Sequence, residues 1–263
     1  MYEAYSYKNC SKFVSYTCVG VKQASHKVLV MTISPTVVAI GECMIELCGI
    51  DTPPLLLKAG GDTCNTAIYM TRLGMEVAYM TALGADPFST KMRLDWETEG
   101  LDTTLVLTDP ARLPGQYAIR TDDDGERRFF YWRRTSAARR LFTLEGIDAM
   151  LERAAQARLL YLTGITLSLF DRAGRSRLLD LACQVRSNGG DVAFDSNYRP
   201  QNWSHVRTAR KAIEDFAGIV TIALPTRDDE CLLHGKCDSD ATIRRWQDFG
   251  AREVIVQLGA EGC

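Results

Sequence analysis

The stretch Val77-Ala-Tyr-Met-Thr-Ala-Leu83 decides the fold class of this chain. It is almost continuously apolar and has no alternating polar positions, which is typical of a strand buried on both faces of a parallel sheet. Similar runs occupy 37–40, 159–162, 192–194, 219–224 and 254–258, and stretches with a helical pattern lie between the runs at 63–73, 88–99, 144–157, 172–186, 205–216 and 239–249. Strands and helices that alternate on this scale predict an α/β protein with a doubly wound, mostly parallel sheet.

The composition argues against several classes of protein. The chain has 263 residues, of which 46% are hydrophobic and 24% charged, the usual proportions of a globular protein. Its 31 basic and 33 acidic side chains give a net charge of −2, so no basic surplus favours a nucleic-acid partner. No run of about 18 apolar residues is present to span a membrane. The nine cysteines include no Cys-x-x-Cys pair, which indicates reduced thiols and a cytoplasmic protein.

Two departures from the strand–helix rhythm divide the chain. Residues 1–36 show no sustained period, so we expect a poorly ordered N-terminal extension before an α/β domain over 37–263. Within that domain, residues 43–58 and 103–134 carry no helical pattern, and polar and apolar residues alternate on both sides of the hairpin signal Asp122-Asp-Asp-Gly125. We expect these two segments to form a small β-sheet lid, a feature that commonly covers a site.

A glycine-rich turn, Gly60-Gly-Asp-Thr-Cys-Asn65, leads into the first expected helix. Gly60 and Gly61 let a ligand approach the backbone closely. Asp62 and Asn65 offer hydrogen-bonding groups, and the free N–H groups of a helix start favour hydroxyls or an anion. The alternative is an ordinary tight turn into a well-capped helix.

Two further clusters suit a polar, anionic ligand. The first, Asp195-Ser-Asn197-Tyr-Arg199, directly follows the run at 192–194, and open α/β sheets bind ligands beyond the carboxyl ends of their strands. The second consists of Tyr117, Tyr131 and Arg133 in the expected lid, where an arginine can form a bidentate pair with a carboxylate. The alternatives are a loop tied by local hydrogen bonds and an ordinary half-exposed sheet face.

The commoner nucleotide-binding loops do not occur in the sequence. No Gly-x-Gly-x-x-Gly follows the first strand, and no Gly-x-x-x-x-Gly-Lys-Ser/Thr is present anywhere. These absences argue against an NAD-dependent dehydrogenase and against a P-loop enzyme.

Six stretches in register resemble the ribokinase-like PfkB family of carbohydrate kinases, and within it the kinases of 2-keto-3-deoxy sugar acids. They are VAIGECMIEL at 38–47, GGDT at 60–63, TALG at 81–84, RLPG at 112–115, FYWR at 130–133 and FDSNYRP at 194–200. Each is weak alone, but the six occur in the family's order. The likeness extends over about residues 37–263.

This resemblance implies transfer of a phosphoryl group from ATP, with Mg²⁺, to the 6-hydroxyl of a sugar acid such as 2-keto-3-deoxygluconate. It assigns the sugar hydroxyls to Gly60, Gly61, Asp62 and Asn65, the walls of the sugar pocket to Tyr117 and Tyr131, and the carboxylate to Arg133 and Arg199. The nucleotide would meet Asn197, Arg199, Leu258, Gly259 and Gly262. Asp229 or Glu230, where the family has an Asn-x-x-Glu element, would influence Mg²⁺. Lids of this family often pair between subunits, so a homo-oligomer through the lid is expected.

Two family elements differ in this chain. The lysine of the Lys-x-Gly element is Gln257, which is expected to weaken nucleotide binding. The Gly-Ala-Gly-Asp element, which supplies the anion hole and the catalytic Asp, does not occur in the 263 residues and is expected beyond Cys263, so no catalytic residue is assigned. We therefore expect a truncated chain that is poorly soluble or relies on a partner and has little or no kinase activity.

Two other functions stay open on the sequence alone. One is a non-catalytic protein that binds a sugar acid, and the other is a PfkB-family kinase of another sugar such as fructose. Arg133 and Arg199 favour an acid, because a neutral sugar needs no carboxylate partner.

Overall fold

The chain is described from residue 35 onward. A computed structural model describes residues 35–49, 54–122, 127–235 and 238–263. The predicted extension, 1–36, lies outside the described residues except for its last two, and it stays a prediction. Most of the predicted hairpin turn after Asp122 also lies outside them.

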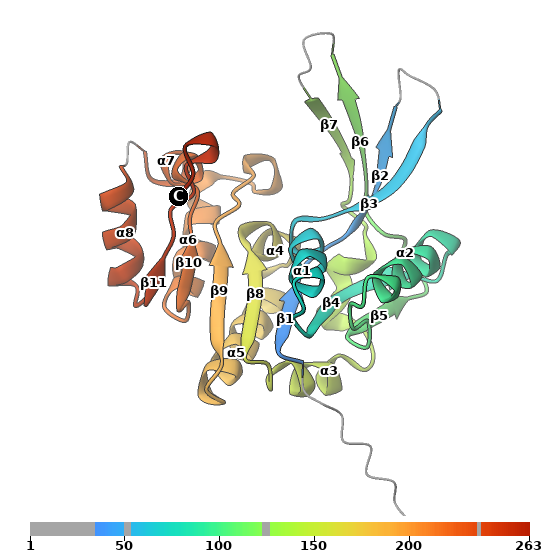
Figure 1. Cartoon of the computed structure of the whole chain (residues 1–263), viewed down its shortest axis with the longest axis horizontal. Helices are drawn as coiled ribbons and strands as arrows, with labels where there is room; N and C mark the ends of the chain where they lie inside the picture. Colours follow the sequence, from blue (N-terminus) through green and yellow to red (C-terminus); the bar gives the residue numbers. More distant parts are fainter. Residues whose placement is uncertain (1–34, 50–53, 123–126, 236–237) are drawn as a thin grey trace, which may run out of the picture. The chain divides into compact units, whose positions relative to one another are not determined.

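Seven parallel strands form the main sheet, in the order β11-β10-β9-β8-β1-β4-β5 (Figure 1). Their bounds are β1 Val37–Ile40, β4 Val77–Gly84, β5 Val106–Asp109, β8 Leu159–Thr163, β9 Asp191–Asp195, β10 Ile222–Leu224 and β11 Glu253–Val254. The chain proceeds from β1 to β4 and β5, then crosses to the other side of β1 for the remaining strands. The order therefore reverses between β1 and β8, and the carboxyl ends of these strands frame the crevice where open α/β sheets bind ligands.

Helices cover both faces of this sheet, as a doubly wound fold requires. Their bounds are α1 Asp62–Arg72, α2 Pro87–Thr98, α3 Ile147–Ala154, α4 Gly164–Leu169, α5 Arg172–Ser187, α6 Val206–Ala217, α7 Arg227–His234 and α8 Ser239–Asp248, with 3-10 turns η1 Ala137–Thr143, η2 Pro200–Asn202 and η3 Gly259–Glu261. The predicted fold class is confirmed. Across the described ranges, no helix has the length and apolar character that crossing a bilayer requires.

Alternate residues of β1 pack on opposite sides of the sheet. Val38 and Ile40 belong to the core that α3, α5 and α6 share, whereas Val37 and Ala39 belong to the core under α1 and α2. Both sides of the strand are buried, which explains its continuous apolar run.

Four strands form a second, smaller sheet, which we call the lid. Its order is β3-β2-β6-β7, with β2 Met44–Cys48, β3 Leu56–Gly60, β6 Gln116–Thr121 and β7 Arg127–Trp132. β2 runs parallel to β6, and the two outer pairs are antiparallel. Because β2 follows β1 after three residues, the lid stands at the carboxyl edge of the main sheet (Figure 1).

One part of the predicted lid belongs to the main sheet instead. Residues 106–109 form β5, which pairs in parallel with β4 and places Val106 opposite Thr81. β5 is an edge strand, and its two middle residues are less buried than its ends. An edge strand with partly exposed positions shows the same polar–apolar pattern as a lid strand, so the sequence does not distinguish the two.

Candidate sugar-acid site

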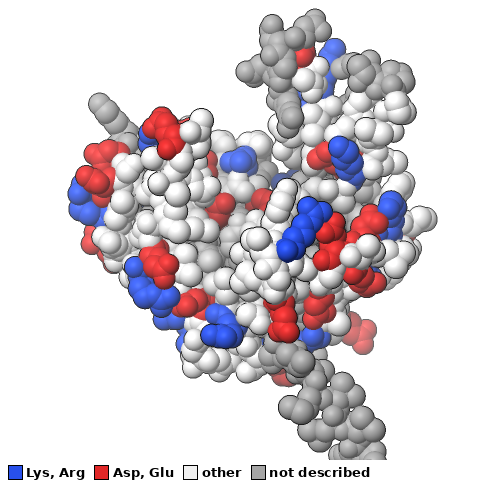
Figure 2. Space-filling view, in the orientation of Figure 1, with Lys and Arg blue, Asp and Glu red and all other residues white. Residues whose placement is uncertain are grey.

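A cavity of about 770 Å³ lies between the lid and the carboxyl edge of the main sheet. Figure 2 shows a hollow there with acidic and basic groups on its walls. Every residue predicted to hold the substrate lines this one cavity. They are Gly60, Gly61, Asp62, Asn65, Tyr117, Tyr131, Arg133 and Arg199. Asn197, which was predicted to meet the nucleotide, lines it as well. The fold brings these distant positions together because β1, β8 and β9 end at one edge and the lid lies over that edge.

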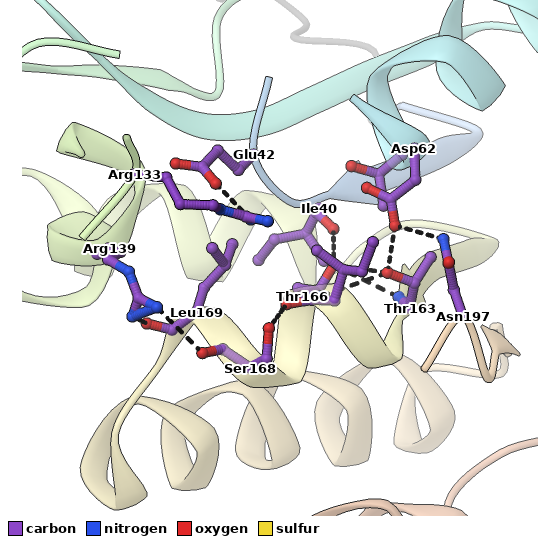
Figure 3. A network of polar contacts seen from close by, with 12 residues as sticks. Ile40, Glu42, Asp62, Arg133, Arg139, Thr163, Thr166, Ser168, Leu169 and Asn197 are labelled. Carbon is purple, nitrogen blue, oxygen red and sulfur yellow. Dashed lines mark hydrogen bonds and ion pairs between the residues drawn. The ribbon is translucent and has the colours of Figure 1, made fainter. Parts of the chain in front are cut away.

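Asp62 ties three parts of the cavity floor together (Figure 3). Its Oδ2 accepts hydrogen bonds from the hydroxyl of Thr163 at 2.6 Å and from the side-chain amide of Asn197 at 3.0 Å. Thr163 ends β8 and caps α4, where the hydroxyl of Thr166 donates to the carbonyl of Ile40 at 2.9 Å. The ends of β1, β8 and β9 are thereby fixed to the start of α1.

Gly60 and Gly61 have no room for a side chain. Gly61 has an extended backbone, but a Cβ there would clash with the carbonyl oxygen of Glu42 and lie 3.0 Å from the Cα of Cys43. A Cβ at Gly60 would clash with the hydroxyl of Tyr117. No side chain caps the N-terminus of α1. Its first-turn N–H groups therefore suit an oxygen of a bound ligand.

Three aromatic rings on the inner face of the lid form one wall of the cavity. The ring centroids of Tyr117 and Tyr131 lie 5.8 Å apart, and Phe129 lies 6.2 Å from each of them. The hydroxyl of Tyr117 donates to the carboxylate of Glu46, and burial together with this contact raises the pKa of Tyr117. Such a wall can pack against the carbon skeleton of a sugar, while the hydroxyls of the sugar stay available for polar groups elsewhere in the cavity.

The two predicted carboxylate-binding arginines have different surroundings. Arg133 is buried and forms an ion pair with Glu42, which follows β1 (Figure 3). Arg199 is about half exposed; its Nη1 donates to the carbonyl of Tyr198 at 2.9 Å and lies 3.7 Å from the carboxylate of Asp229. Neither contact occupies all five N–H donors of a guanidinium, so both side chains can still bind an anion.

Acidic groups gather beneath the cavity. Burial raises the pKa of Asp195 to about 6, and the negative charges of Asp62 and Asp229 act in the same direction. The backbone N–H of Asn197 donates to Asp195 at 3.0 Å and opposes the shift. Asn197 itself has a φ of 26°, in the left-handed region that asparagine tolerates better than most residues.

Asp229 and Glu230 lie in the first turn of α7 and already have protein partners. Asp229 accepts the backbone N–H of Tyr198 at 2.9 Å, and burial raises its pKa. The two oxygens of Glu230 accept from Arg245 at 2.5 Å and from the indole of Trp246 at 3.1 Å. Within the described ranges, no cluster of three or more His, Cys, Asp or Glu forms a metal site. Both carboxylates are therefore engaged by protein groups in this structure, and an influence of either on Mg²⁺ stays a prediction.

The other predicted nucleotide contacts lie outside the cavity. Leu258, Gly259 and Gly262 form the turn after β11, where both glycines have positive φ. The turn nevertheless lies at the carboxyl edge of the main sheet. Gln257, just before the turn, forms a parallel β-bridge with Thr226, which follows the end of β10. The side chain of Gln257 donates to the carbonyl of Leu224 at 2.8 Å. The glutamine that replaces the family's lysine thus holds two neighbouring strand ends together.

Several residues of the cavity were not assigned from the sequence. They are Glu42, Met44, Phe129, Ile165, Gln201 and Asn202. Phe129 could have been predicted from the sequence, because it lies two positions from Tyr131 on β7 and therefore on the same face of the strand. Glu42 belongs to a recognised motif, but no spacing rule connects it with Arg133.

Comparison with known proteins identifies the family. A family model for pfkB family carbohydrate kinases matches residues 34–263. The chain belongs to the PfkB family of carbohydrate kinases. It is 42% identical over 230 residues to the 2-dehydro-3-deoxygluconokinase of Dickeya dadantii (strain 3937), covering 85% of this chain and 73% of the relative. The protein of the same name from Escherichia coli (strain K12) is 40% identical over 236 residues, covering 88% and 75%.

Solved structures agree with the PfkB assignment. A PfkB protein from Polaromonas sp. JS666 superposes with a TM-score of 0.78 at 27% identity, covering 87% of this chain and 78% of that one. A fructokinase from Xylella fastidiosa with bound ATP has a TM-score of 0.72 at 21% identity, covering 88% and 70%. The second likeness shows the ribokinase-like fold alone.

Proposed function

We propose that this PfkB chain binds 2-keto-3-deoxygluconate in the cavity under the lid and directs its 6-hydroxyl toward ATP. The observation that carries the proposal is the presence of Arg133 and Arg199 in the same cavity as the hydroxyl-binding loop at 60–65. A substrate with a carboxylate at one end and hydroxyls along its chain matches that distribution. The relatives that are 40% or more identical carry the name of this activity.

In the proposed reaction the substrate's 6-hydroxyl attacks the γ-phosphorus of ATP. The O–P bond to the sugar forms, the bond to the ADP oxygen breaks, and the hydroxyl proton is released. The arginines hold the carboxylate end and so point the opposite end of the molecule at the nucleotide. Phosphoryl transfer depends mainly on such positioning and on charge stabilisation.

We propose that ATP lies along the carboxyl edge of β9 to β11, beside the sugar cavity. Asn197, Arg199 and the turn at 258–262 follow strands of that edge and would contact it. Mg²⁺ would arrive with the nucleotide, because this ion is usually held by phosphates and few carboxylates. Among the carboxylates at this edge, Asp229 would be the one to assist it. A cytoplasmic location, where ATP and reduced thiols occur together, completes the proposal.

We propose that a second copy of the chain covers the outer face of the lid. One apolar row crosses all four strands on that face, because the register places Leu57 opposite Leu47, Leu47 opposite Ala118, and Ala118 opposite Phe130. The side chains of Leu57 and Phe130 are 53% and 48% exposed. Ala118 in the middle of the row is only 2% exposed, so the exposed apolar surface is at its two ends, Leu57 and Phe130. An uncharged surface of this kind is self-complementary, and a two-fold pairing of lids would bury it.

The kinase activity is tested by ADP release from ATP with 2-keto-3-deoxygluconate, with fructose as the neutral comparison. The 263-residue chain is measured beside the Dickeya dadantii relative, of which it covers 73%. We expect ADP release with the sugar acid and little with fructose. Turnover of fructose alone would assign another sugar, and binding without turnover in both would assign a binding protein.

A further inference from the structure

Glu42 is a buried carboxylate at the wall of the cavity with no role in the function proposed above. It is the second residue after β1, and its side chain is 1% exposed. Its partner is Arg133, which comes from the end of the lid and is almost as deeply buried. Figure 3 shows the guanidinium of Arg133 lying against the Glu42 carboxylate. The pair therefore joins the main sheet to the lid at the edge of the site.

The polar atoms of this pair are incompletely satisfied. Within the described part of the chain, neither oxygen of Glu42 has a hydrogen-bond partner, nor do Nε and Nη2 of Arg133. Nη2 of Arg133 and Oε2 of Glu42 are nevertheless in ionic contact. Native proteins leave few buried polar atoms without partners, because each one is destabilising. Arg133 nevertheless lines the cavity, and its Nη1 is not among these buried atoms, so Nη1 is the atom placed to bind an anionic ligand.

The surroundings of Glu42 are basic. Arg139 lies nearby, with its Nη1 donating to the carbonyl of Leu169 at 2.8 Å. Burial lowers the pKa of Arg139; the charge of Glu42 opposes that shift, and the charge of Arg133 adds to it. Glu42 thus contacts one guanidinium, that of Arg133, and interacts electrostatically with a second, that of Arg139. Arg139 does not line the cavity, but its positive charge favours the negative charge of Glu42 beside Arg133.

The backbone leaves the pair little freedom. A Cβ on Gly115 would lie 2.8 Å from Oε1 of Glu42 and 3.1 Å from Cβ of Arg133. Both side chains therefore pack directly against this glycine. The backbone of Glu42 is held by the end of β1, and its carboxylate packs against Gly115. Glu42 can therefore anchor the longer side chain of Arg133.

We propose that Glu42 is a positioning residue that holds the guanidinium of Arg133 toward the substrate carboxylate and so sets the preference for an acid over a neutral sugar. The proposal rests on the sugar-acid function proposed above. An arginine anchored on its buried side loses less conformational freedom when its exposed edge binds a carboxylate. Without the anchor, the ligand itself must order the side chain.

The test is a double-mutant cycle of Glu42→Gln and Arg133→Met, with ligand affinity measured by calorimetry on the 263-residue chain. The ligands are 2-keto-3-deoxygluconate and 3-deoxyfructose, which carries a hydroxymethyl group in place of the carboxylate. We expect Glu42→Gln to weaken the acid about tenfold and the neutral sugar less than twofold. In the Arg133→Met background, Glu42 is an unpaired buried anion, so adding Glu42→Gln should strengthen acid binding.

The reversal of sign is the decisive result, because a merely structural role would weaken both ligands in both backgrounds. Equal losses for the two ligands, or additive effects of the two substitutions, would overturn the role of Glu42. If Glu42→Gln alone does not fold, Glu42→Asp, which keeps the charge but shortens the side chain, replaces it and should weaken the acid more than the neutral sugar. Asp109→Asn is the matched control: Asp109 is also buried, lies 3.4 Å from Arg140 and does not line the cavity. Failure of the unmodified chain to bind the acid would overturn the proposed function and this inference together.

Discussion

The side-chain amide of Asn197 donates a 3.0 Å hydrogen bond to Asp62 across 135 residues of sequence. This bond joins the loop after β9 to α1. Thr163, at the end of β8, donates to the same carboxylate oxygen at 2.6 Å. The floor of the cavity is therefore a shared polar network, and its central member is Asp62.

Replacing Asp62 should affect binding and stability together. Asp62→Ala leaves the hydroxyl of Thr163 and the amide of Asn197 without their acceptor, so we expect about 1–3 kcal/mol of lost stability and at least a tenfold loss of affinity for 2-keto-3-deoxygluconate. Asp62→Asn keeps one acceptor oxygen and should show a smaller loss of each. Calorimetry and urea unfolding measure the two effects. Asp148→Ala removes an exposed carboxylate paired with Arg177 and serves as the control; an Asp62→Ala chain with undiminished affinity would contradict the assignment.

The pKa of Asp195 predicts a pH dependence of stability. Its value of about 6 in the folded chain lies above the ordinary 3.8, so the folded chain holds this proton more tightly than the unfolded chain. The free energy of unfolding contributed by Asp195 therefore falls as the pH rises from about 4 to about 6, and it is constant above that range. Asp195→Asn removes the titration and should eliminate a decline of about 1–3 kcal/mol.

Urea unfolding of both chains at pH 4, 5, 6 and 7 measures this difference. Comparing the two chains cancels the contributions of other titrating groups. Stability curves that run parallel over the whole range would show that Asp195 titrates normally.

The outer face of the lid should mediate self-association. Phe130→Lys places a charge in the apolar row, so we expect it to reduce the molar mass from that of an oligomer to that of one chain. Light scattering after size-exclusion chromatography measures the mass. Phe88→Lys is the matched control, because Phe88 is on α2 and has the same 48% exposure as Phe130. A single-chain mass for the unmodified protein would contradict the proposed pairing.

The sequence predicts the main sheet well because its strands are buried on both faces. A continuous apolar run such as 77–83 leaves little ambiguity, and the helices between the strands are amphipathic. α4 was not predicted, since its six residues are too short to show a period. β10 and β11 are shorter than their apolar runs, which extend beyond the paired residues.

The candidate site was predicted as separate clusters, and the topology joins them. Polar residues after strands were expected at the carboxyl edge, and Asp62, Asn197 and Arg199 do lie there. The ion pair of Glu42 with Arg133 could not be predicted, because it depends on how the lid packs against the end of β1. The same contact shows that Arg133 has an internal partner, which the arginine pattern alone does not reveal.

The most direct test of the account is the affinity of the 263-residue chain for 2-keto-3-deoxygluconate and for 3-deoxyfructose, measured by titration calorimetry under one set of conditions. The two ligands differ only in the group that Arg133 and Arg199 would bind. The account predicts that the acid binds at least about tenfold more tightly, the value of one charge-assisted contact. Equal affinities, or tighter binding of the neutral sugar, would contradict the claim that this cavity recognises a sugar acid.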